Sequence, residues 1–286
     1  MRRAPRIDGV AWVRLAGLLC LGAIVVTAIS AEGGTPLAIA PLARALDWQP
    51  ALGLREPWRL WTCAWVHWSA AHLGVNVVGA LVVAFVGWRG RLSAVATGAW
   101  FVAWPLTQLL MAALGDDRLG SVMAHYGGLS GVLHAGVIVM GLSLAWPPVR
   151  SRIRRSPGAG VAPSRMDTGF VATRASMIEP SRITEGPWAM TSLEELATQT
   201  GLPVSTLDQP SYESPPSPAL RVRWIGVAIV AGTLMKVVFE APWDMAPRPS
   251  AVLGMSVAPI AHACGVAAGL LAWAGVRIAT RGHRRP

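Results

Sequence analysis

The stretch WVHWSAAHLGVNVVGALVVAFVG, residues 65–87, decides the class of fold. It is long enough to cross a hydrocarbon core, which takes about 20 residues of α-helix. It also carries His67, His72 and Asn76 near its start. Polar side chains at membrane depth are costly unless they face a bundle interior or a wet cavity, so we expect a membrane helix with one functional face.

Five other segments are apolar over a comparable length, namely 10–30, 92–114, 129–146, 222–240 and 259–277. Segment 129–146 is short, and segment 222–240 holds Lys236 and Glu240. Hydrophobic residues make up 53% of the 286 residues and charged residues 14%, with a mean hydropathy of +0.45. A soluble domain of this length cannot bury so much apolar surface. The sequence therefore predicts an all-α membrane protein, a bundle of six transmembrane helices.

The net charge of +10 and the pI near 11.2 would suggest nucleic acid in a soluble protein, but the arginines follow the membrane topology instead. With the N-terminus in the cytoplasm, the cytoplasmic segments hold Arg2, Arg3, Arg6, Arg14, Arg89, Arg91, the 150–155 cluster and the arginines from Arg277 to Arg285. This positive-inside bias predicts that both termini are cytoplasmic, and we expect no nucleic acid partner. The alternative, that residues 1–30 are a signal peptide, would invert that assignment.

Residues 147–221 have a different composition, rich in Pro, Ser, Thr, Gly and Arg, and hold seven of the fifteen acidic residues. We expect a cytoplasmic, disordered insert that separates helices 1–4 of one core (10–146) from helices 5–6 (222–277). A docking or regulatory segment is the alternative, and Ser192 with Glu195 fits a capping box for a short helix. Residues 278–286 would form a basic cytoplasmic tail.

Ser130 is the candidate nucleophile, in the segment Gly127-Gly128-Leu129-Ser130-Gly131 that opens the fourth span. Glycines on both sides let the backbone turn tightly and approach another helix. A serine at a helix start also has free backbone N–H groups beside it, which can bind an oxyanion. The alternative is a small-residue turn with a serine N-cap.

A serine nucleophile needs a general base, and His262 near the start of the sixth span is the candidate. Gly265 and Gly269 follow it and form a small-residue stripe, which lets a membrane helix pack closely on a neighbour. Because His262 lies one turn before Gly265, it projects from nearly the same face. A lone interfacial histidine is the alternative.

His72 and Asn76 share one helical face because they are four residues apart, so they can offer two donors to an oxyanion. A metal site at His67 and His72 is the rival, but no Asp, Glu or Cys completes a set at helical spacing. The three cysteines, Cys20, Cys63 and Cys264, also lack metal-type spacing. We expect no metal and no cofactor.

The predicted topology places these candidates together. Ser130, His262, His72 and Asn76 all fall near the outer ends of their spans, about 5–10 Å below the outer surface at 1.5 Å per residue. That shared depth favours a Ser130–His262 dyad.

Four motifs follow one another along the chain: Glu56-Pro57-Trp58-Arg59, then His67, His72 and Asn76, then Gly128-Leu129-Ser130-Gly131, and last Ala261 to Gly269. In this order they resemble the rhomboid family of intramembrane serine proteases. The resemblance implies a six-helix core, with Ser130 as nucleophile and His262 as base. His72, Asn76 and the Ser130 N–H would stabilise the oxyanion, and no acidic third member is expected.

The same resemblance implies where the site lies and what it meets. It would open toward the periplasmic side of a bacterial inner membrane and cut single-span membrane proteins within the lipid bilayer. The first loop would lie in the outer interface, with Trp48, Trp58, Trp61, Trp65 and Trp68 as aromatic anchors.

A finer resemblance is to the rhombosortase subgroup, carried by the run from Gly128 to His134 and by Lys236 and Glu240. Rhombosortases are thought to cut C-terminal sorting tails, in which Gly-Gly precedes one span and a basic end. The long insert departs from this pattern, as does Ala135 in place of glycine. The residues for which a structural or gating role is implied are Glu56, Arg59, His67, Gly128, Gly131, His134, Lys236, Glu240, Gly265 and Gly269.

Lys236 and Glu240, four residues apart, can neutralise each other, and a purely structural ion pair is the alternative to a functional one. Two rival functions remain. A catalytically inactive rhomboid-like protein that binds membrane clients usually lacks the serine or the histidine, and both are present here. A transporter or channel is a weaker rival because no internal repeat is evident.

Overall fold

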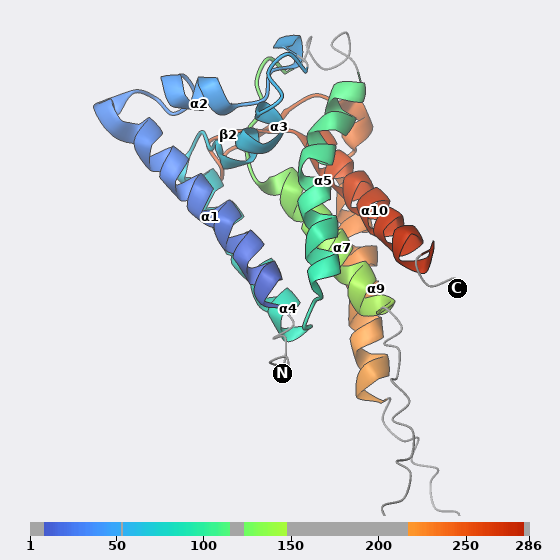
Figure 1. Cartoon of the computed structure of the whole chain (residues 1–286). Coiled ribbons are helices and arrows are strands. Elements are labelled where there is room, and N and C mark those ends of the chain that lie inside the picture. The colour runs from blue at the N-terminus through green and yellow to red at the C-terminus, as the bar shows by residue number, and fades with distance from the viewer. Residues whose placement is uncertain (1–8, 53, 115–122, 148–216, 283–286) are drawn as a thin grey trace, which may run out of the picture. The chain divides into compact units, whose positions relative to one another are not determined.

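The computed structural model describes residues 9–52, 54–114, 123–147 and 217–282, and long α-helices dominate them (Figure 1). The long helices are α1 Val10–Ala31, α4 Ala70–Arg89, α5 Ala94–Ala113, α7 Ser130–Ala145, α9 Pro218–Phe239 and α10 Pro259–Gly282. Two short helices, α2 Pro41–Leu46 and α3 Arg59–Thr62, lie between α1 and α4 in the chain. Short 3₁₀ turns occupy Glu32–Gly34, Pro50–Leu52, Cys63–Trp65 and Pro242–Asp244.

An antiparallel hairpin precedes α10 and was not part of the all-α prediction. Its strands are β1 Arg248–Ser250 and β2 Met255–Val257. Residues 148–216, which hold most of the predicted insert and the capping box at Ser192 and Glu195, lie outside the described residues. The last four residues of the predicted basic tail also lie outside them. The last residues of the predicted insert, 218–221, belong to helix α9.

Five of the described helices are long and apolar enough to cross a membrane, namely α1, α4, α5, α9 and α10. Their outer faces agree with that assignment. On α4, Val75, Val78, Leu81, Val82 and Phe85 are each more than half exposed. Such a row of exposed apolar side chains is unfavourable in water and suited to lipid. The chain is therefore a multi-pass, mainly helical membrane protein, as the composition predicted.

The sixth predicted span, α7, is shorter than the others. Its sixteen residues extend about 24 Å at 1.5 Å per residue, less than a hydrocarbon core of about 30 Å. It packs against α4, α5, α9 and α10, and twelve of its sixteen residues are buried. Because protein surrounds α7, its length need not match the bilayer.

The start of α4 also differs from the prediction. Helix α4 begins at Ala70 rather than at residue 65, and His67 precedes it. Ser69 is the N-cap, since its hydroxyl accepts a hydrogen bond from the His72 backbone N–H at 3.0 Å. The same hydroxyl donates to the carbonyl of Leu253 at 2.5 Å. The start of α4 is thus joined to the turn of the β1–β2 hairpin.

Helices α7 and α10 approach each other at two glycines. A Cβ on Gly265 would overlap the carbonyl group of Gly131, and one on Gly269 would lie 2.7 Å from the carbonyl oxygen of Ala135. The predicted small-residue stripe therefore meets α7, as close helix packing requires. This contact sets the distance between the two helices that carry Ser130 and His262.

The first loop is organised around the buried carboxylate of Asp47. Arg59 donates to an Asp47 carboxylate oxygen at 3.1 Å and to its backbone carbonyl at 2.6 Å, and Arg59 also pairs with Glu56 at 2.6 Å. His125 contacts the other Asp47 carboxylate oxygen at 2.7 Å. Burial raises the pKa of the Asp47 carboxyl, and hydrogen bonds and charges from Gln49, His125 and Arg59 oppose that rise. Arg59, paired with Glu56, thus stabilises the first loop through its contacts with Asp47.

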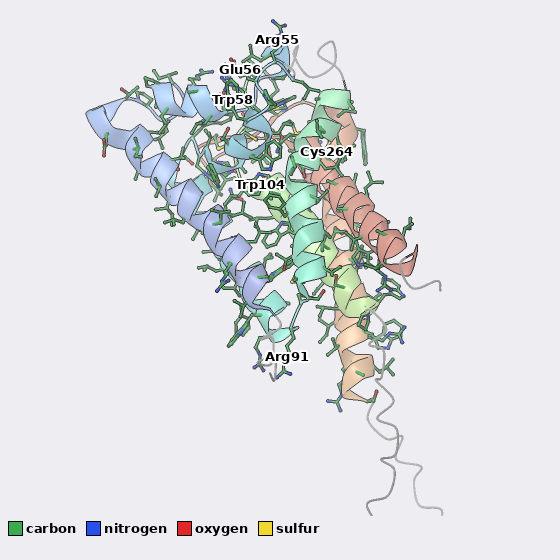
Figure 2. All side chains as sticks on the ribbon, viewed as in Figure 1. Arg55, Glu56, Trp58, Arg91, Trp104 and Cys264 are labelled. Carbon is green, nitrogen blue, oxygen red and sulfur yellow. The ribbon has the colours of Figure 1, made fainter. Side chains whose placement is uncertain are left out.

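The five tryptophans expected as interfacial anchors do not all face outward. Trp48 is 1% exposed, and its backbone pairs with that of Tyr126 through two hydrogen bonds of 2.8 Å. Its position in the core rules out an anchoring role for Trp48, which sequence position alone had suggested. Trp58 is half exposed. Figure 2 shows Trp58 near Arg55 and Glu56, at the opposite end of the helices from Arg91.

Candidate active site

One cavity of about 730 Å³ is lined by Ser130, His262, His72 and Asn76. Helices α4, α7, α9 and α10 and the β1–β2 hairpin contribute to its walls. Of the other predicted residues, His134 and Lys236 line it too. Those outside its lining are Glu56, Arg59, His67, Gly128, Gly131, Glu240, Gly265 and Gly269.

Ser130 is the first residue of α7, directly after the N-cap Leu129. The first backbone N–H groups of a helix have no acceptor within it, so the N–H of Ser130, a residue that lines the cavity, has no partner inside α7. Gly128 has φ +127°, and a Cβ there would lie 2.6 Å from Cε1 of the His72 ring. Glycine is therefore needed at 128 both for the turn and for the close approach of His72.

His262 is 5% exposed near the start of α10. Its Nδ1 lies 2.7 Å from a carboxylate oxygen of Glu240, the C-cap of α9. The resemblance had implied no acidic third member, and this contact differs from that expectation. The contact was missed because the two residues belong to different helices, and the spacing in sequence linked Glu240 only to Lys236.

His134 stacks on His262, with ring centroids 4.2 Å apart and an angle of 18° between the planes. Its Nδ1 lies 2.6 Å from the carbonyl oxygen of Ser130. Since a carbonyl only accepts, Nδ1 of His134 carries the proton and Nε2 is left as an acceptor. Lys236 Nζ lies 3.1 Å from that Nε2 and 2.6 Å from Glu240. The predicted contact of Lys236 with Glu240 is confirmed.

The two oxyanion candidates differ in how they are held. Asn76 donates one amide hydrogen to the carbonyl of His72 at 3.0 Å, which leaves its second N–H available. The His72 ring lies 4.7 Å from that of His67, and its buried Nδ1 has no partner in the described structure. Within the described ranges, no group of three or more His, Cys, Asp or Glu side chains forms a metal-ligand set.

No family model matches this chain, and no curated protein matches it. The chemistry of the cavity and the motifs in the sequence therefore carry the functional assignment.

Tyr126 is a neighbour of Ser130 that the sequence did not single out. Its phenol lies against Gly131 and beside Ser130, without a hydrogen bond of good geometry among the described residues. Burial raises the pKa of Tyr126 well above its usual range, so the phenol stays protonated and can donate. The only available signal was that this tyrosine, one of two in the chain, lies four residues before Ser130.

The side chains of Ser130 and His262 line the same cavity, but in the described structure no hydrogen bond joins them. Such bonds are often long in a free enzyme and shorten when substrate binds. Together the residues provide a hydroxyl, an imidazole and several N–H donors around one space. That combination suits acyl transfer through a serine nucleophile.

Proposed function

We propose that this chain is an intramembrane serine endopeptidase of the rhomboid type, with six membrane-crossing helices including α7. The observation that carries the proposal is the presence of Ser130 and His262 on two helices in glycine-mediated contact, lining one cavity among membrane helices. Free N–H groups at the start of α7 and the amide of Asn76 supply donors for an oxyanion.

In the proposed reaction, Ser130 Oγ attacks the carbonyl carbon of the scissile peptide bond while Nε2 of His262 accepts the hydroxyl proton. The carbonyl oxygen gains the negative charge and is stabilised by the Ser130 N–H, His72 and Asn76. When the C–N bond breaks, His262 returns the proton to the leaving amine. Water then attacks the acyl-enzyme with His262 again as base, which releases the acid product and restores Ser130.

The substrate class we propose is a single-span protein with a Gly-Gly sorting tail, by similarity of residues 128–134 and of Lys236 and Glu240 to the rhombosortase subgroup. In this proposal both termini are cytoplasmic, in line with the arginine distribution. The cavity then opens toward the periplasmic side of a bacterial inner membrane.

The proposal is tested with the full chain in proteoliposomes and a single-span reporter that ends in Gly-Gly, one apolar segment and an arginine-rich terminus. We expect cleavage next to the Gly-Gly pair, located by mass spectrometry of the products. A matched reporter with Val-Val in place of Gly-Gly should be cut more slowly. Cleavage of both at equal rates would contradict the Gly-Gly preference alone. Binding of the reporter without any cleavage would instead support the inactive client-binding alternative.

Replacing Asn76 by alanine is expected to lower kcat by about 100-fold with little change in KM, because an oxyanion donor acts in the transition state. The measurement is the rate of reporter cleavage against reporter concentration. Gly74→Ala is the matched control on the same helix, since a Cβ at Gly74 meets open space. A rise in KM with unchanged kcat would assign Asn76 to substrate binding.

A further inference from the structure

We propose that Glu240 is a positioning residue for His262, so that the site operates as a Ser130–His262–Glu240 triad. This inference rests on the proposed function and adds a member that the resemblance does not supply. It is carried by the 2.7 Å contact between His262 Nδ1 and Glu240 Oε2. A carboxylate in this place holds the ring of the base in orientation and stabilises the imidazolium that forms during attack.

The contact selects the tautomer of His262. An ionised carboxylate only accepts hydrogen bonds, so Nδ1 of His262 must carry the proton and donate to Glu240. The lone pair is then on Nε2, the nitrogen that has to take the proton from Ser130. Without Glu240, a neutral His262 could place its proton on either nitrogen, and only one of those forms can act as base.

The second carboxylate oxygen is held as well. Glu240 Oε1 lies 2.6 Å from Lys236 Nζ, which also lies 3.1 Å from Nε2 of His134. His134 in turn bonds the Ser130 carbonyl and stacks on His262. A continuous chain of contacts therefore links the backbone of Ser130 to the ring of His262. Two fixed oxygens determine the plane of the carboxylate, which a single contact would not.

The competing explanation is that Glu240 only neutralises Lys236, as the spacing in sequence allows. Lys236 has a side chain that is 50% exposed, whereas the His262 side chain is 7% exposed. An exposed ion pair contributes little to stability. A nearly buried imidazole bonded to a carboxylate is a stronger constraint. The geometry therefore favours the role toward His262, and the two explanations predict different double variants.

The experiment measures the rate at which a fluorophosphonate probe labels the full chain in proteoliposomes across a range of pH. Ser130→Ala provides the blank. We expect Glu240→Gln to slow labelling by at least about 100-fold. Glu240→Asp, which keeps the charge, should recover part of the rate. Asp244→Asn is the matched control, because it removes an acid from the next loop whose carboxylate, among the described residues, pairs with exposed Arg248. That control should label at the wild-type rate.

The pH profile separates a positioning role from a structural one. His262 contacts Glu240, the C-cap of α9, and stacks on His134 from α7, while His72 from α4 is more distant. Lys236 from α9 contacts both Glu240 and His134. Of these, Glu240 supplies the negative charge. Its loss removes the charge that stabilises the imidazolium formed during attack, so the maximal rate should fall in Glu240→Gln and the pH profile should no longer match that of the wild type.

The double variant Lys236→Met with Glu240→Gln decides between the two explanations. If Glu240 positions His262, the double variant stays as slow as Glu240→Gln. The inference is overturned if the double variant recovers the wild-type rate, or if Glu240→Gln labels within about twofold of wild type with an unshifted profile. Labelling of the Ser130→Ala blank would instead overturn the proposed nucleophile, so the two failures are distinguishable.

Discussion

Replacing Ser130 by alanine is expected to abolish both cleavage of the Gly-Gly reporter and labelling by the fluorophosphonate probe. In the proposed mechanism no other group replaces the missing hydroxyl, because the acyl-enzyme forms on Ser130 Oγ. Cleavage should fall to the background of the lipid-only sample. Helix content and thermal stability should be retained, since alanine is the best helix former and the change removes a single oxygen.

The matched control is Ser143→Ala, which removes a hydroxyl from the other end of the same helix, α7. We expect it to cleave at the wild-type rate. Full activity in Ser130→Ala would exclude the serine mechanism. Loss of activity in both variants would show that α7 tolerates neither change, and circular dichroism of the two proteins would then reveal damaged helices.

Replacing Gly265 by valine is expected to produce the largest loss of stability among single changes in α10. A Cβ at this position would overlap the carbonyl group of Gly131, and the atoms it meets belong to the backbone and cannot rotate away. Helices α7 and α10 would have to separate, at a cost of about 3 kcal/mol or more. Separation would also carry His262 away from Ser130, so cleavage should be lost.

The measurement is the thermal unfolding midpoint in detergent, followed by the cleavage assay at a temperature where the variant remains folded. Gly275→Ala is the control on the same helix, where a Cβ has no atom within 4 Å. That variant should unfold at or slightly above the wild-type midpoint, because alanine favours helix over glycine. An unchanged midpoint in Gly265→Val would mean that the two helices do not meet at this glycine.

The sequence predicted the long helices well because length and apolar content are local properties. Helix α1 begins at Val10 and α5 lies inside the predicted 92–114 segment. The start of α4 was misplaced because Trp65, Val66 and Trp68 are as apolar as the residues of the helix itself. Hydropathy does not detect the N-cap at Ser69. The sequence indicated that the span of α7 is short, but the enclosure of α7 by four neighbouring helices is a tertiary property.

The candidate site was predictable where a motif kept its partners close in sequence. The glycines around Ser130 and after His262 predicted a close contact between two helices, and the structure contains that contact between α7 and α10. The Glu240–His262 contact joins residues from two helices, and the Asp47–His125 contact spans 78 positions. No periodicity connects such pairs, so only the folded arrangement reveals them.

The shortness of α7 has a consequence for which substrates the proposed protease could select. Trp146 follows α7 and is 45% exposed, as suits a side chain at a membrane interface. If Trp146 marks one interface, α7 stops about 6 Å short of a full hydrocarbon core, and Ser130 would be recessed by that distance from the other. A substrate helix would have to unwind locally to offer its backbone at that depth. Substrates would then be selected by how easily a segment leaves the helical state. A Gly-Gly pair favours such a segment, because each glycine weakens a helix by about 1 kcal/mol.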